Sequence, residues 1–284
     1  MKGLEVATER GTVLDGVIFD AENADTVVIA ITGIHGNFYS NPFYFNIGDT
    51  LSANGIDFVY AQTNDAFGKI ETYNAKTSAK EIIGSWNERF SYTDDDIGAY
   101  LDFAEKNNYK HIILAGHSLG ANKVIHYLSG HHDEKKPEHF IFLSPANLTH
   151  MMENVTASEK EIIRRMVNYK QGEKILPFYF MGWVQCTANT AYDWISGALN
   201  NVHTEVDGDF NQIEKITHNG AMVIGTYDKF TRGNPANFLE NINDHMKTSS
   251  ENKLVFIEKT GHTYQQKEQE IADIILKIVE GWRQ

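Results

Sequence analysis

Residues 111–130 read HIILAGHSLGANKVIHYLSG. The stretch opens with a short apolar run, 111–116, of the kind that forms a buried strand. It continues with Gly116-His117-Ser118-Leu119-Gly120 and ends in 121–130, where apolar residues recur at helical spacing. A serine between two near glycines therefore lies on the corner between a predicted strand and a predicted helix.

A corner of this kind has chemical consequences for Ser118. The sharp turn forces the serine into a strained backbone conformation and lifts its hydroxyl clear of the sheet edge, at the positive end of the following helix. Gly116 and Gly120 remove side chains that would collide with the neighbouring strand and helix. An ordinary serine in a glycine-rich turn is the alternative interpretation. The strand and helix on either side favour a nucleophile elbow.

Short apolar runs rich in β-branched residues recur along the chain and suit parallel strands buried on both faces. These runs are 26–31, 56–61, 111–116, 139–144, 221–226 and 253–258. Residues 11–20 alternate apolar and polar, as a half-buried strand does. Because helical patterns lie between several of the runs, the sequence predicts an α/β fold with a mostly parallel central sheet covered by helices on both faces.

The predicted helices begin at recognisable signals. Thr93 and Asp96 resemble a capping box before one helix, and Ser158 and Glu161 resemble another. Apolar spacing predicts further helices over 121–130, 188–199 and 271–282.

The strand pattern is interrupted between 148 and 212, where only helical patterns are convincing. We predict a core formed by 1–147 and 213–284, and a helical cap or lid formed by 148–212. The segment contains LPFYFMGW at 176–183, and we expect Trp183 to contribute to a substrate pocket that shields an acyl or aromatic group from water.

A serine hydroxyl is a poor nucleophile without a base. His262 lies just after the last predicted strand, and Asp228 lies just after the preceding one. All three residues follow strands, at the edge where open α/β sheets bind ligands. The sequence therefore predicts Ser118, Asp228 and His262 as nucleophile, acid and base.

Other residues compete for these roles. Rival acids are Glu205, Asp207 and Asp209, but no predicted strand leads into them, and the loop after 139–144 has no carboxylate. We interpret His117 as a packing residue and the remaining histidines, apart from His35, as surface residues.

An oxyanion hole needs two backbone N–H donors. Leu119, directly after the nucleophile, supplies one. The loop after run 26–31 supplies the other from either Ile34 or Asn37, and the position of the strand end favours Ile34. His35 then lines the substrate pocket or braces the loop.

Composition excludes several classes of protein. The formal charge is −13, which argues against a nucleic-acid or anionic-membrane surface. The single cysteine, Cys186, forms no intrachain disulfide and no cysteine metal cluster. The N-terminal residues lack a signal-peptide pattern, so we expect a cytoplasmic protein. The chemistry predicted for Ser118, His262 and Asp228 implies no metal or organic cofactor. The sequence leaves the oligomeric state open.

With these motifs in place, the chain from about Thr12 onward resembles the α/β-hydrolase superfamily. GHSLGANKVIHYLSG, SPANL, CTANTAYDWISG and GSWNERF more closely resemble a loosely characterised bacterial and fungal group related to siderophore esterases. The resemblance implies an acyl-enzyme mechanism on esters, thioesters or amides. We expect a serine hydrolase of the carboxylesterase type that acts on a small-molecule ester. The alternatives are a thioesterase, a peptidase, or a receptor that uses a hydrolase pocket.

Overall fold

The computed structural model describes residues 1–134 and 136–283. Within these residues, eight strands form one sheet in the order β1-β2-β4-β3-β7-β8-β9-β10. β1 and β2 pair antiparallel, β2 is antiparallel to β4, and the remaining neighbours are parallel. The strands are β1 Lys2–Ala7, β2 Val13–Phe19, β3 Thr26–Ile31, β4 Asp57–Ala61, β7 His111–His117, β8 His139–Leu143, β9 Asn219–Gly225 and β10 Lys253–Ile257.

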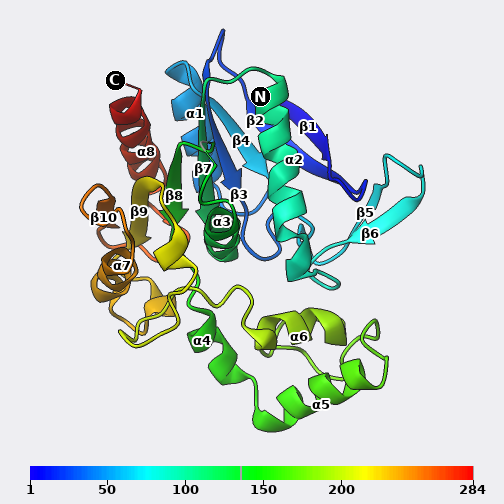
Figure 1. Ribbon diagram of the computed structural model, residues 1–284. Coiled ribbons are helices and arrows are strands. Elements are labelled where there is room, and N and C mark those ends of the chain that lie inside the picture. The colour runs from blue at the N-terminus through cyan, green and yellow to red at the C-terminus, as the bar shows by residue number, and fades with distance from the viewer. Residues whose placement is uncertain (135, 284) are drawn as a thin grey trace.

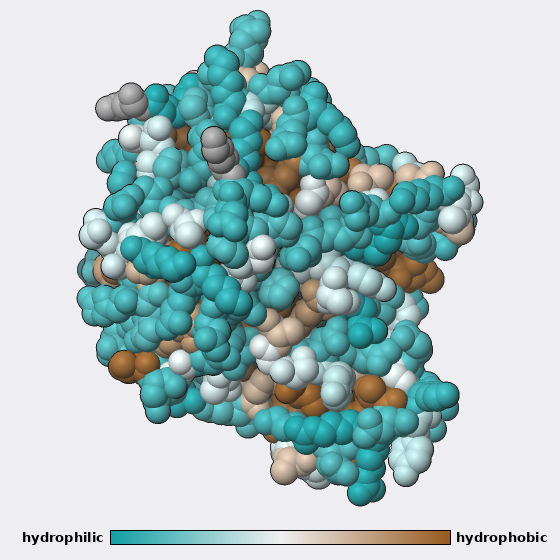
Figure 2. Space-filling view, viewed as in Figure 1, coloured by the Kyte–Doolittle hydropathy of each residue, from teal (hydrophilic) through white to brown (hydrophobic). Residues whose placement is uncertain are grey.

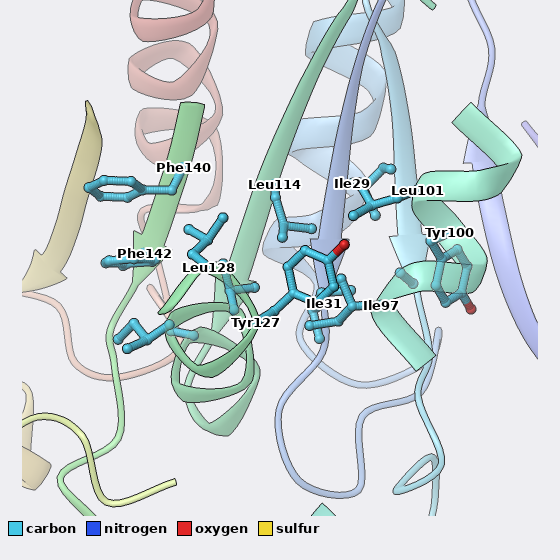
Figure 3. Close-up of a cluster of buried hydrophobic side chains, with 14 of the residues drawn as sticks. Ile29, Ile31, Ile97, Tyr100, Leu101, Leu114, Tyr127, Leu128, Phe140 and Phe142 are labelled. Atoms are coloured by element: carbon cyan, nitrogen blue, oxygen red, sulfur yellow. The ribbon is translucent and has the colours of Figure 1, made fainter. Parts of the chain in front are cut away.

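Helices cover both faces of this sheet (Figure 1). α1 Phe43–Ala53 and α8 Glu268–Trp282 pack on one face, while α2 Thr93–Lys106, α3 Leu119–Gly130 and α7 Pro235–Asp244 pack on the other. Successive side chains of each strand point to opposite faces of the sheet, so every strand contributes to the apolar layers on both faces. In β7, for example, Ile113 and Ala115 join the first layer, whereas Ile112 and Leu114 join the second. Figure 3 shows side chains of the second layer, contributed by β3, β7, β8, α2 and α3.

Each predicted apolar run forms a strand, but two parts of the prediction are wrong. β10 is an edge strand and only half-buried, because no neighbour covers its outer side. β1, the hairpin of β5 Ile70–Tyr73 and β6 Lys80–Ile83, α1 and α7 were not predicted. β1, β5 and β6 bury few side chains, so their sequences carry little periodic apolar signal.

Both predicted capping boxes are misplaced. Thr93 is the first residue of α2, and Tyr92 precedes it without a side-chain cap. The capping box of α5 Ala157–Asn168 is formed by Thr156 and Glu159, two residues before the predicted pair. Because Thr and Ser at neighbouring positions satisfy the same motif, the sequence alone does not fix the register.

Residues 148–212 contain α4 Leu148–Met151, α5, α6 Ala188–Ser196 and the 3₁₀ turn η2 Met152–Asn154. Figure 1 shows these helices grouped at one end of the sheet. Their apolar residues form a cluster that also contains Phe90, Leu119 and the partly buried Ile34. The segment is tied to the core by the Thr187 N–H, which donates to the Trp86 carbonyl at 2.7 Å. The remaining 3₁₀ turns are η1 Phe90–Tyr92, η3 Ile213–Lys215 and η4 Lys229–Thr231.

The surface in Figure 2 is mostly hydrophilic, with apolar residues showing through on the lower part of this face, near α5 and α6. The exposed large apolar side chains of residues 148–212 include Ile162, Ile175 and Trp183. Among the described residues, no helix has both the length and the apolar character needed to cross a membrane.

Candidate active site

Ser118 lies at the junction of β7 and α3 in a conformation that serine rarely adopts, with φ 56° and ψ −128°. Its N–H donates to the Leu143 carbonyl at 3.0 Å, which holds the turn against β8. A Cβ atom at Gly116 would lie 2.4 Å from the carbonyl oxygen of Gly120, and one at Gly120 would lie 2.2 Å from that of Ile31. The turn therefore requires both glycines, as predicted for a strained elbow.

His262 and Asp228 extend from Ser118 in a hydrogen-bonded row. His262 Nε2 lies 2.8 Å from Ser118 Oγ, and His262 Nδ1 lies 2.8 Å from Asp228 Oδ2. His262 is in the loop between β10 and α8, and Asp228 is in the loop after β9. A carboxylate only accepts hydrogen bonds, so neutral His262 carries its proton on Nδ1 and accepts the Ser118 hydroxyl at Nε2.

The Asp228 carboxylate is held on both sides. It is 1% exposed, and its second oxygen, Oδ1, accepts the N–H of Phe230 at 2.9 Å. The rival acids are engaged elsewhere: Glu205 pairs with Arg232 at 2.9 Å, and Asp209 accepts the N–H of Asn211 at 3.0 Å. The structure thus brings Asp228 to His262 and leaves these two rivals away from it.

The loop after β3 approaches the serine through Gly33. A Cβ atom there would lie 2.9 Å from Ser118 Cβ, so the backbone of this loop runs directly beside Ser118. Among the hydrogen bonds of the described residues, none uses the amide N–H of Ile34, Asn37 or Leu119. Asn37, the alternative donor, directs its carbonyl to the Tyr60 hydroxyl and its side-chain oxygen to the Tyr39 and Ser40 amides.

His35, in the loop after β3, is in contact with Trp183, in residues 148–212. Their ring centroids are 5.3 Å apart at 72°, an edge-to-face contact. His35 has φ 57°, and burial lowers its pKa, with Asp65 acting in the opposite direction. Trp183 lies within a tight turn closed by hydrogen bonds between Phe180 and Val184, and it remains half-exposed. The contact brings residues 148–212 against the loop that approaches Ser118.

Two features near the site were not predicted from the sequence. The Phe230 ring packs on His262 with centroids 4.5 Å apart. Under α3, the buried Lys123 ammonium lies 3.0 Å from Asp65 and 2.6 Å from Glu88. Burial raises the pKa of the Glu88 carboxyl, and the charge of Lys123 acts in the opposite direction. A lysine within an amphipathic helix hints at this cluster, but its carboxylate partners are distant in sequence and carry no local signal.

The histidine predictions are partly wrong. His117 is buried among aromatic rings, consistent with a packing residue. His203 and His218 were predicted on the surface but are buried, because each finds a backbone carbonyl for its ring N–H. Among the described residues, no group of three His, Cys, Asp or Glu side chains could hold a metal ion.

A family model described as "Protein of unknown function (DUF1749)" matches residues 16–272. The chain belongs to this family. A comparison with curated protein sequences gives no match.

Solved structures similar to this member of the DUF1749 family include esterases and a lipase. Est1E from Butyrivibrio proteoclasticus has 17% identity and a TM-score of 0.65, with 99% of this chain and 98% of that chain covered. An esterase from Exiguobacterium antarcticum has 14% identity and a TM-score of 0.62, covering 98% and 100%. A soluble variant of monoglyceride lipase from Saccharomyces cerevisiae has 12% identity and a TM-score of 0.68, covering 99% and 94%.

Est1E has also been solved with ferulic acid bound, and that structure matches with 17% identity and a TM-score of 0.67, covering 98% of each chain. At these identities the likeness shows the fold. The predicted α/β-hydrolase fold is confirmed.

Proposed function

We propose that this protein is a serine hydrolase of the carboxylesterase type that cleaves a small-molecule ester. The observation that carries the proposal is the row from Ser118 through His262 to Asp228, joined by two contacts of 2.8 Å at a strained elbow. A nucleophile, a base and an orienting acid in this geometry are what acyl transfer requires. Their order along the chain is also that of α/β-hydrolases.

The chemistry follows from these positions. Ser118 Oγ attacks the acyl carbon while His262 Nε2 takes its proton. The same nitrogen then gives the proton to the departing alcohol, leaving an acyl-enzyme. A water molecule then attacks the acyl-enzyme with His262 again taking and returning the proton, which releases the acid and restores Ser118. Asp228 keeps the His262 ring oriented and stabilises the imidazolium that forms in each half-reaction.

The oxyanion of each tetrahedral intermediate is assigned to the amides of Ile34 and Leu119. Both amides lack an intramolecular acceptor among the described residues, and the backbone at Gly33 lies against Ser118. Preorganised amides of this kind stabilise the charge that develops during acyl transfer. The Asn37 N–H likewise lacks an acceptor among the described residues, so the preference for Ile34 rests on its place directly after Gly33, whose backbone lies beside Ser118.

Residues 148–212 are proposed as a cap over the site, with 1–147 and 213–284 as the core. Support comes from the apolar cluster that joins this segment to Leu119 and Ile34, and from the contact between His35 and Trp183. We infer an acyl or aromatic substrate group that packs against this cap. The binding of ferulic acid by Est1E and the sequence resemblance to siderophore esterases are both compatible with an ester substrate.

Removing the indole should alter selectivity. We expect Trp183→Ala to change the ratio of kcat/KM for aromatic and acetyl esters by about 3- to 10-fold, since an aromatic contact contributes about 0.5–1.5 kcal/mol. Hydrolysis of p-nitrophenyl acetate and of p-nitrophenyl phenylpropenoate, which share a leaving group and differ in the acyl group, measures the ratio. Tyr169→Ala, an exposed aromatic residue in the same segment, is the control. An unchanged ratio in Trp183→Ala would remove Trp183 from the substrate pocket.

Labelling with a fluorophosphonate tests the function directly. We expect the wild type to be labelled on Ser118, with no labelling after denaturation, because the probe needs an activated serine. A labelled protein that cleaves thioesters or peptides faster than esters would change the substrate class but keep the mechanism. A folded wild-type protein that resists labelling would favour the receptor alternative and overturn the proposal.

A further inference from the structure

His117 is a neighbour of both the proposed nucleophile and the proposed base, but it has no part in the proposed reaction. It is the last residue of β7, directly before Ser118, and is 2% exposed. Strand alternation turns its side chain to the face covered by α1 and α8, away from α3. The loop that carries His262 runs into α8, so the two histidines meet on this face. Their ring centroids are 5.0 Å apart.

The contact between them is directional. His117 Nε2 lies 2.8 Å from the backbone carbonyl oxygen of His262. A carbonyl only accepts hydrogen bonds, so Nε2 carries the proton and Nδ1 presents a bare lone pair. Nδ1 is buried without a partner among the described residues. Burial, with a smaller effect from His262, lowers the pKa of His117 to about 3, so the ring stays neutral at physiological pH.

The surroundings of His117 keep its ring in place. The Phe43 ring meets it edge-to-face with centroids 5.0 Å apart. Tyr264, two residues after His262, packs nearby and donates its hydroxyl to the Val223 carbonyl at 3.0 Å. The ring is therefore a fixed donor aimed at one peptide group, and that peptide group belongs to the proposed base.

We propose that His117 is a positioning residue for catalysis: its Nε2–H fixes the backbone of His262, so that the His262 ring stays within hydrogen-bond distance of both Ser118 and Asp228. This inference rests on the proposed hydrolase function. A loop carrying a base must hold it to a fraction of an ångström, and misplacement by about 1 Å costs on the order of 100-fold in rate. The neutrality of His117 also matters, because a second positive ring at this distance would oppose formation of the His262 imidazolium.

Three substitutions separate positioning from packing. His117→Leu fills similar space without a donor. His117→Gln places an amide nitrogen the same number of bonds from Cβ as Nε2, and His117→Asn is one methylene too short to reach. We expect Leu and Asn to lower kcat on p-nitrophenyl acetate by about 10- to 100-fold with KM nearly unchanged. Gln should restore most of the lost kcat.

His218 provides a matched control. It is also buried, places Nε2 3.2 Å from a backbone carbonyl, that of Glu134, and leaves Nδ1 without a partner among the described residues. It precedes β9, at the opposite end of the sheet from Ser118. We expect His218→Leu to lower the melting temperature as much as His117→Leu does, and to leave kcat unchanged.

The outcomes are distinct. A loss of kcat in Leu and Asn, rescue by Gln and a silent His218→Leu support the positioning role. Equal kcat in His117→Asn, His117→Gln and the wild type overturns it, even if His117→Leu does not fold. A wild type and a His218→Leu variant that both fail to hydrolyse any ester reject the proposed function itself, which is a different result.

Discussion

Ser118→Ala is expected to lower kcat for ester hydrolysis by about 10⁴- to 10⁶-fold while the protein stays folded. The substitution removes the protein atom that forms the covalent bond to the acyl group in the proposed reaction. The fold should tolerate it, because the Ser118 N–H bond to Leu143 is a backbone contact that alanine keeps. The remaining rate reflects substrate binding and the oxyanion amides acting on water.

The measurement is steady-state hydrolysis of a p-nitrophenyl ester, with circular dichroism to establish folding. Ser129→Ala is the matched control. This serine lies on the same helix, α3, and its hydroxyl donates to the His126 carbonyl at 2.8 Å. We expect Ser129→Ala to retain wild-type kcat. A folded Ser118→Ala protein with more than about one tenth of the wild-type rate would mean that another group is the nucleophile.

The parts of the structure that could be predicted from sequence are those set by local pattern. The apolar run of β7, the glycines around Ser118 and the helical spacing of α3 are contiguous, so each supports the interpretation of the next. His262 and Asp228 were placed by the rule that strand ends meet at one sheet edge. Applying that rule requires only the positions of the predicted strands in the sequence, without knowledge of any contact in the structure. The observed distances of 2.8 Å agree with it.

What could not be predicted depends on partners distant in sequence. Lys123 reads as an ordinary helix residue, but the folded chain surrounds it with Asp65 and Glu88. The His117 contact to the His262 carbonyl likewise involves a backbone atom, which has no signature in a side-chain pattern. Edge elements such as β1 were not predicted, because only Val6 of that strand is buried. The local periodicity of apolar residues indicates which side chains are buried. The Lys123 cluster, the His117 contact and β1 depend instead on pairing with other parts of the chain.

Asp228→Asn is expected to lower kcat by about 10⁴-fold with little change in fold or KM, the loss seen when a triad histidine is held in the wrong tautomer. The structure predicts how the amide will orient. Because the Phe230 N–H donates to Oδ1, the amide oxygen of the new asparagine should occupy that position. Its NH₂ group then takes the place of Oδ2 and donates to His262 Nδ1.

That orientation reverses the protonation of the base. With Nδ1 accepting from the amide, the His262 proton must sit on Nε2, pointing at Ser118, where no lone pair remains to take the serine proton. Steady-state kinetics and fluorophosphonate labelling rate measure the loss, and Glu205→Gln, which alters a rival acid paired with Arg232, is the control. If Glu205→Gln lost activity while Asp228→Asn stayed within about tenfold of the wild type, the acid would be Glu205, and the Asp228 contact would serve only to hold the loop.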